Sequence, residues 1–93
     1  MLPNDLRKIA ASAAKRCTYP EIKAELETRL EPQFVGLGMK LAMIHAAECV
    51  CNLSSIHERR NALDSFPEHD DDLGDVRDEM MMMTQRLWKR RRS

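Results

Sequence analysis

The sequence predicts an all-α protein, a single domain over residues 1–93 built as a small bundle of four to five helices. Its four aromatic residues are few for a β-sandwich or a β-barrel. Seven methionines and many alanines favour helix, because these unbranched side chains lose little rotamer freedom in one. Apolar residues also recur at helical spacing, most clearly near the C-terminus.

Two amphipathic helices are expected in the first third of the chain. Residues 4–16 carry apolar side chains along one stripe, and Asn4 is placed to cap the helix. In the stretch TYPE, residues 18–21, Thr18 and Glu21 have the spacing of a capping box, and Pro20 falls in the first turn. A second helix therefore begins here and ends near Pro32. Its predicted core side chains are Tyr19, Ile22, Leu26 and Leu30.

The middle of the chain predicts a central apolar helix over about 34–53. Apolar residues occur nearly all the way around it, and only a narrow polar stripe remains at Lys40 and Glu48, which is typical of a buried helix. Ser55 and Glu58 repeat the capping-box spacing and predict the start of a short fourth helix. That helix closes before Pro67, and its predicted inward side chains are Ile56, Leu63 and Phe66.

Residues 67–75 form an acidic, turn-forming linker, and a long amphipathic C-terminal helix is expected over about 72–91. Apolar residues step by three and four along this helix, as in the seam of a coiled coil. The seam predicts either a contact with the rest of the bundle or a homodimer. Its residues are Leu73, Val76, Met80, Met83 and Leu87.

The three cysteines do not have the spacing of a disulfide framework, and the N-terminus lacks an apolar signal core. We therefore expect reduced cysteines and a cytoplasmic protein. His45 and Cys49 are four residues apart, as two metal ligands on one helix would be, but Cys51 points to another side. These residues are better explained as core, so no metal and no cofactor is predicted.

No catalytic motif is present, so we expect that the protein is not an enzyme. The acidic linker resembles a calcium loop only superficially, because Met81 occupies the twelfth position counted from Asp70, where an EF-hand has glutamate. The longest apolar region contains Lys40, His45 and Glu48, which argues against a membrane span.

The C-terminal stretch DEMMMMTQRLWKRRRS indicates a contact surface. The heptad explains Met80 and Met83 as core but leaves Met81 and Met82 on other faces, and Met81 and Trp88 share a side. We predict a small regulator, adaptor or inhibitor that docks on a larger protein or complex, in the style of phage or mobile-element accessory proteins. The predicted partner-binding residues are Met81, Met82, Arg86, Trp88, Lys89 and Arg90.

The alternative is a nucleic-acid-binding regulator. Seven acids lie between Glu68 and Glu79, whereas five bases and no acid follow Met80. The basic tail, residues 89–93, could track phosphates beside a stacking Trp88. The first two helices resemble the opening of a helix-turn-helix but lack a glycine in the turn and a polar recognition helix. The candidate nucleic-acid contacts are Lys89, Arg90, Arg91 and Arg92.

Overall fold

The protein is an all-α bundle, as the composition and periodicity predict. The computed structural model describes residues 4–92, and within that range it contains five helices and no strand. The helices are α1 (Leu6–Ala14), α2 (Tyr19–Arg29), α3 (Pro32–Asn52), α4 (Ile56–Asp64) and α5 (Val76–Arg92). The predicted central and C-terminal helices are thus both present, with slightly shifted bounds.

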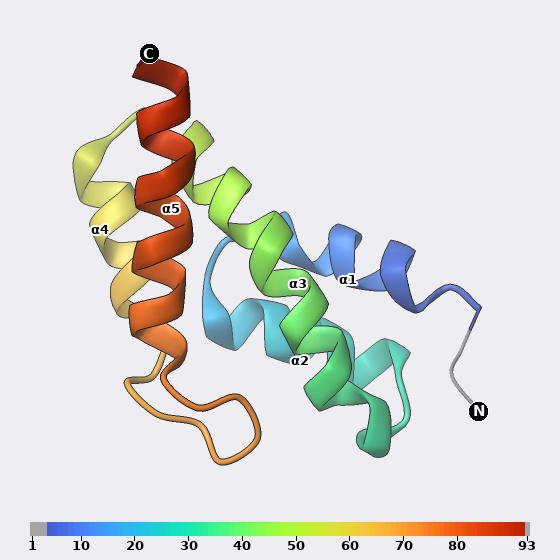
Figure 1. Ribbon diagram of the computed structural model, residues 1–93. Coiled ribbons are helices and arrows are strands. Elements are labelled where there is room, and N and C mark those ends of the chain that lie inside the picture. Colours follow the sequence, from blue (N-terminus) through green and yellow to red (C-terminus); the bar gives the residue numbers. More distant parts are fainter. Residues whose placement is uncertain (1–3, 93) are drawn as a thin grey trace.

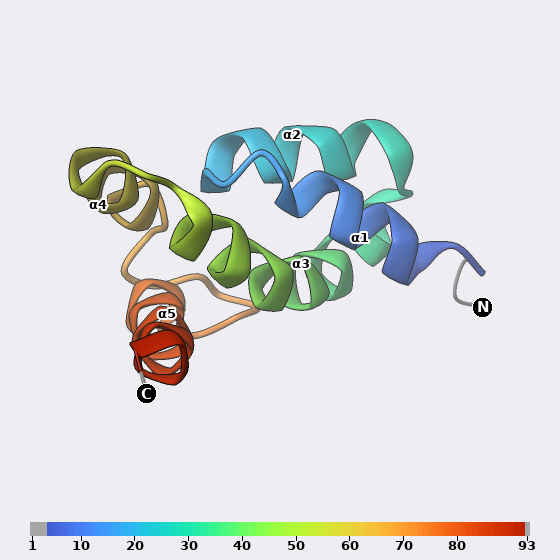
Figure 2. The ribbon, with the colours of Figure 1, turned by 90° about the horizontal axis from the view of Figure 1, so that it is seen from above.

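Helix α3 is the centre of the bundle and contacts each of the other four helices. Helices α1 and α2 lie together on one side of it, whereas α5 lies on the other side and packs against α4 (Figures 1 and 2). The segment that joins α4 to α5 forms a long loop at the opposite end of α5 from the C-terminus (Figure 1). Within residues 4–92, this arrangement leaves the outer face of α5 exposed.

Small residues allow the helices around α3 to approach closely. Alanines supply much of the buried surface of both α1 and α3. At Gly38 of α3, an added Cβ would lie 2.9 Å from Cδ1 of Leu30, so a larger residue there would force the Leu30 side chain at the end of α2 to shift. The largest fully buried side chains are Ile22, Leu26, Val50, Phe66, Val76 and Met80.

The heptad seam of α5 packs inside its own chain. Val76 and Met80 are fully buried, and Leu73, Met83 and Leu87 pack half-buried against the same core. This accounts for the regular spacing without a second copy of the chain. A homodimer through the seam stays a prediction, and it would have to use the half-buried Leu73, Met83 and Leu87, because Val76 and Met80 are enclosed within the chain.

Three local predictions about helix starts need correction. Helix α5 begins at Val76 rather than near residue 72. The preceding residues form a turn instead, in which the backbones of Asp70 and Gly74 exchange hydrogen bonds and Gly74 has a φ of +79°. Helix α1 begins at Leu6 with Asp5 as its N-cap, so Asn4 does not cap it. Thr18 is the N-cap of α2 but makes no side-chain capping bond, whereas the predicted Ser55 cap is present and accepts from two amides.

Two predictions about burial also differ from the structure. Helix α3 is not enclosed on all sides, since Leu37 and Ile44 are 38% and 57% exposed. Ile56 does not point inward and is 64% exposed, because it opens α4 on the outer side of the first turn. By length and composition α3 is the one helix among the described residues that could cross a membrane, and 44% of its apolar stretch is buried in the bundle.

Candidate functional site

The candidate site is the outer face of α5, and its position is fixed by contacts at the start of the helix. Arg77 donates from Nε to the Phe66 carbonyl oxygen at 2.8 Å and from a terminal nitrogen to the Asp64 carbonyl oxygen at 3.2 Å. These bonds join the first turn of α5 to the last turn of α4. Together with the buried seam, they orient the helix and determine which side chains remain outside.

The residues predicted to bind a partner are all at the surface. Met81 and Met82 are 42% and 52% exposed, and Trp88 is 37% exposed. The predicted cationic neighbours are exposed as well: Arg86, Lys89 and Arg90. The methionine run is therefore divided, as the heptad predicts, into two core residues and two surface residues.

These side chains do not form one strip. Met81 and Trp88 are seven residues apart, which places them about 20° apart around the helix. Met82 lies about 120° from Trp88 by the same geometry and is instead one turn from Arg86. The outer face of α5 therefore presents a Met81 and Trp88 side, toward α4, and a Met82 side, flanked by cations.

Arg59 of α4 is a site residue that the sequence reading did not identify. Its guanidinium lies 4.4 Å from the centre of the Trp88 ring, so a cation–π contact covers one face of the indole. The Arg59 Nε is buried and has no hydrogen-bond partner. No sequence pattern links residue 59 to residue 88, because the pairing depends on how α4 folds back on α5.

Charge is separated along the length of α5. Exposed cations gather at the C-terminal end: Arg60 from α4, with Lys89, Arg90 and Arg91 from α5. The acidic loop, residues 67–75, lies at the other end (Figure 1). The side chain of Arg92, predicted as a nucleic-acid contact, and Ser93 of the predicted basic tail lie outside the described residues. The uneven charge of the sequence thus becomes an acidic loop at one end of α5 and a basic cluster at the other (Figure 1).

The acidic loop uses its first aspartate to hold itself in place. The Asp70 carboxylate accepts from the amides of Asp72 and Leu73 at 2.8 and 3.1 Å and from the Tyr19 hydroxyl at 3.1 Å. These hydrogen bonds lower the pKa of Asp70, most strongly through the Asp72 amide. Burial and the neighbouring Asp70 charge raise the pKa of Tyr19 to about 12.

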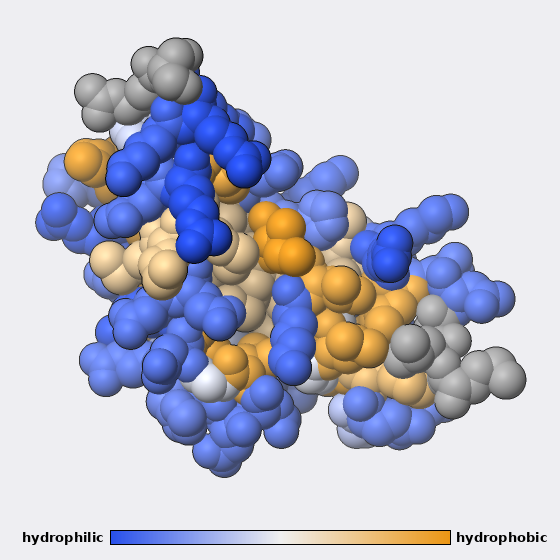
Figure 3. Space-filling model, viewed as in Figure 1, coloured by the Kyte–Doolittle hydropathy of each residue, from blue (hydrophilic) through white to orange (hydrophobic). Residues whose placement is uncertain are grey.

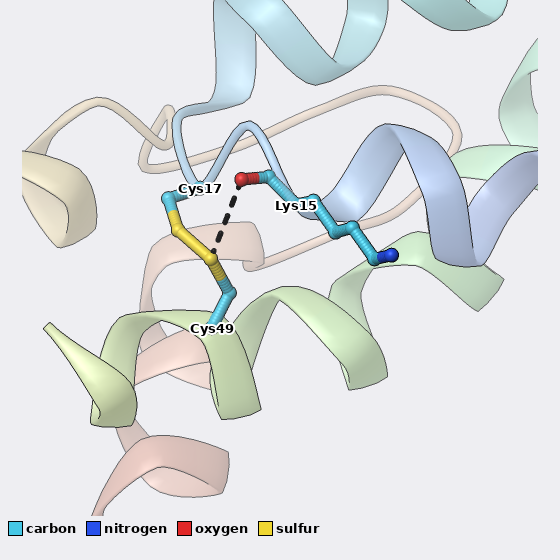
Figure 4. Close-up of a disulfide and its surroundings, with 3 residues drawn as sticks. All are labelled: Lys15, Cys17 and Cys49. Carbon is cyan, nitrogen blue, oxygen red and sulfur yellow. Dashed lines mark hydrogen bonds between the residues drawn. A yellow bond between two sulfur atoms is a disulfide. The ribbon is translucent and has the colours of Figure 1, made fainter.

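The cysteines differ from the expectation of three reduced thiols. Cys17, which follows α1, forms a disulfide with Cys49 of α3, and the Lys15 carbonyl oxygen lies near the Cys49 sulfur (Figure 4). Cys51 remains a free, buried thiol that contacts the Thr84 carbonyl oxygen, and burial raises the pKa of Cys51. The predicted cytoplasmic location is not tested by this pairing and stays a prediction.

His45 is exposed on α3 and is not a core residue, contrary to the sequence reading. Within residues 4–91, no group of three or more histidine, cysteine or acidic side chains is arranged to hold a metal ion. One hollow of about 390 Å³ lies between the acidic loop and the facing ends of α2 and α3. Its polar lining comes from Tyr19, Lys23, Glu27, Asp70 and Asp72.

The sequence and fold were compared with protein-family models, curated proteins and solved structures, and no match was found.

Proposed function

We propose that the chain is a small interaction module, a regulator, adaptor or inhibitor without catalytic activity, that docks on a larger protein through the outer face of α5. The observation that carries the proposal is the exposure of two adjacent methionines, Met81 and Met82, on a helix whose seam is otherwise buried. Flexible methionine side chains adapt to varied apolar surfaces and are enriched at contact sites.

The cations beside these methionines define the partner's chemistry. Arg86 lies one turn beyond Met82, and Lys89 follows on the same side of α5. Such a surface complements an apolar patch bordered by carboxylates, because opposite charges steer the encounter and set the orientation of the complex. The acidic loop at the other end of α5 (Figure 1) disfavours the reverse orientation on the same partner.

Affinity capture with matched variants tests the proposal. The tagged chain, a Met82→Asp variant and a Ser12→Asp control are expressed in the cells that make the protein, and captured proteins are quantified. Ser12 is exposed on α1, away from α5. It lies four residues from both Lys8 and Arg16, so a new carboxylate at this position has cations nearby and should not destabilise the fold. A protein captured by the wild type and the control should decrease about tenfold or more with Met82→Asp.

The contradicting result is a captured set that Met82→Asp does not change. Loss of fold is excluded by thermal unfolding, since Met82 is half-exposed and its replacement should leave the melting midpoint close to that of the wild type. Met80→Asp is the contrasting variant: Met80 is fully buried, and an unpaired acid there should unfold the domain.

A nucleic-acid-binding regulator is the second candidate, favoured by the cations that α4 adds to the basic end. Arg60 and Arg59 extend the cluster beyond the tail that the sequence indicates. Trp88 can stack a base on one ring face only, since Arg59 covers the other. Titration with single-stranded DNA, duplex DNA and RNA, followed by Trp88 fluorescence at about 50 mM and about 200 mM salt, tests it: binding should weaken steeply at the higher salt.

A further inference from the structure

Helix α3 presents an apolar face that no other part of the described chain covers. Ile44 is 57% exposed at the centre of this face, and Leu37 is 38% exposed two turns before it. Leu41, half-buried, continues the stripe between them, since residues 37, 41 and 44 follow helical spacing. Hydrophobic surface runs across the middle of this side of the molecule (Figure 3). Exposed apolar residues that gather on one helix face, instead of being scattered singly, favour an interaction site.

A groove widens this face toward α5. It encloses about 420 Å³ and is lined by Lys40, Met43, Ile44, Leu73, Glu79 and Met83. The walls thus come from both α3 and α5, with Leu73 just before the latter. A helix laid along the exposed face of α3 would place apolar side chains over Ile44 and into this groove.

The charged residues beside Ile44 indicate which helix is complementary to this face of α3. Lys40 and Glu48, both exposed, lie four residues before and four residues after Ile44. If a second α3 crosses antiparallel with Ile44 at the symmetry axis, Lys40 of each copy meets Glu48 of the other. A parallel arrangement would instead bring like charges together. The face is therefore complementary to itself in one orientation, as a two-fold interface requires.

We propose that the chain forms a two-fold symmetric dimer through the exposed face of α3, with the two copies of that helix antiparallel and crossing at Ile44. Leu37, Leu41 and Ile44 supply the apolar contact. The paired Lys40 and Glu48 fix the direction, because surface ion pairs contribute more to orientation than to affinity. This interface is separate from the outer face of α5. Through the groove it also contacts Leu73 and Met83, the half-buried edge of the seam.

Sedimentation equilibrium over a series from low to high micromolar protein tests the dimer and its orientation. The wild type should self-associate. Lys40→Glu and Glu48→Lys, made singly, each replace two attractions by two repulsions and should raise the dimer dissociation constant about tenfold. The double variant Lys40→Glu/Glu48→Lys restores opposite charges and should return the constant to near the wild-type value.

Oxidative cross-linking tests the axis. Under mild oxidation Ile44→Cys should give a covalent dimer, because residues on a two-fold axis face their own copies. Lys40→Cys is the matched control: its two copies lie about 12 Å apart along the helices, beyond disulfide reach. Ser12→Asp should leave the association unchanged.

A wild-type monomer at every concentration would overturn the proposal and leave the α3 face to a different protein. A dimer whose dissociation constant is not recovered by the double charge exchange, or in which Lys40→Cys cross-links as readily as Ile44→Cys, would also overturn it. Leu37→Glu provides a second interface variant should Ile44→Cys fail to fold, and it should shift the equilibrium toward monomer.

Discussion

Cys17 carries an unusual combination of constraints for a single residue. Its backbone takes a φ of +69°, the left-handed conformation that commonly ends a helix at glycine, and its side chain is tied to Cys49 of α3. The disulfide spans 32 residues of sequence and thus connects α1 to the central helix across all of α2. The left-handed conformation is unfavourable for a residue with a Cβ, so the disulfide holds a turn between the first two helices at a position where glycine would be easier to accommodate.

Removing this disulfide should destabilise the fold. Cys17→Ser/Cys49→Ser, or reduction of the wild type, is expected to lower the free energy of unfolding by about 3–4 kcal/mol, because the link restricts the unfolded chain over a loop of that length. Urea denaturation with and without reductant measures the change. The control is Cys51→Ala, whose unfolding should remain sensitive to reductant.

Thiol titration in denaturant without reductant gives an independent check, since one reactive thiol is expected, that of Cys51. Finding three thiols, or equal stability in both redox conditions, would show that Cys17 and Cys49 are not linked.

Tyr19 and Asp70 make stability depend on pH at both ends of the range. Because the folded pKa of Asp70 is lowered, its contribution is present above the unfolded pKa and is lost as the pH falls through the folded pKa. The pKa of Tyr19 is raised from 10.0 to about 12, so its contribution is complete below pH 10 and is lost as the pH rises toward 12.

Tyr19→Phe should therefore lessen the loss of stability on the alkaline side, and Asp70→Asn should lessen it on the acid side. Urea midpoints of the wild type and both variants across the pH range measure the two effects separately. Identical slopes for wild type and Tyr19→Phe between pH 10 and 12 would mean that the hydroxyl does not have the raised pKa.

At the same scale, sequence reasoning could separate Met80 and Met83 from Met81 and Met82, because helical periodicity alone decides which side a residue takes. It could not find the Arg59 contact with Trp88 or the Cys17 disulfide. Both join residues about thirty positions apart, and their meeting depends on how the helices pack.

At the scale of the element, two helix starts show that the spacing of a capping box does not by itself establish a capping hydrogen bond. Ser55 and Thr18 have the same spacing to a glutamate, yet only the Ser55 hydroxyl accepts amide bonds, from His57 and Glu58 at 3.2 and 3.4 Å. At the start of α2 the Tyr19 amide instead donates to the Ser65 hydroxyl, a partner from the end of α4 that no local pattern could predict.

Ser55→Ala should lower the free energy of unfolding by about 1 kcal/mol, the usual cost of a lost N-cap. Thr18→Ala is the matched comparison and should cost less, because Thr18 makes no side-chain capping bond. Urea denaturation of both variants at neutral pH gives the two values. A larger loss for Thr18→Ala than for Ser55→Ala would contradict this assignment of the caps.

Hydropathy alone does not predict which face of the central helix is exposed. Residues 34–53 are apolar nearly all around, which predicts enclosure, and four helices do contact α3. Those four leave the stripe around Ile44 open. Composition can indicate that a helix is central, but the number and placement of its neighbours determine which face remains exposed.

For the molecule as a whole, the fold class, the order of the helices and the buried seam follow from periodicity, whereas the surfaces follow from packing. Two exposed areas result: the outer face of α5, with Met81 and Met82, and the face of α3 around Ile44. The acidic loop and the basic end of α5 lie apart, so electrostatic attraction favours one orientation of an approaching charged partner. The two proposed contacts are compatible, since a partner on α5 leaves the face of α3 exposed.

Site-specific photo-cross-linking tests the central claim, docking through α5, most directly. A photoreactive residue replaces Met82 in the tagged protein, and a second version carries it at Ser12 on α1. After irradiation in the cells that make the protein, position 82 should join covalently to one protein species that position 12 does not trap. Equal or absent cross-links at the two positions, or cross-links from position 82 to nucleic acid alone, would contradict the claim.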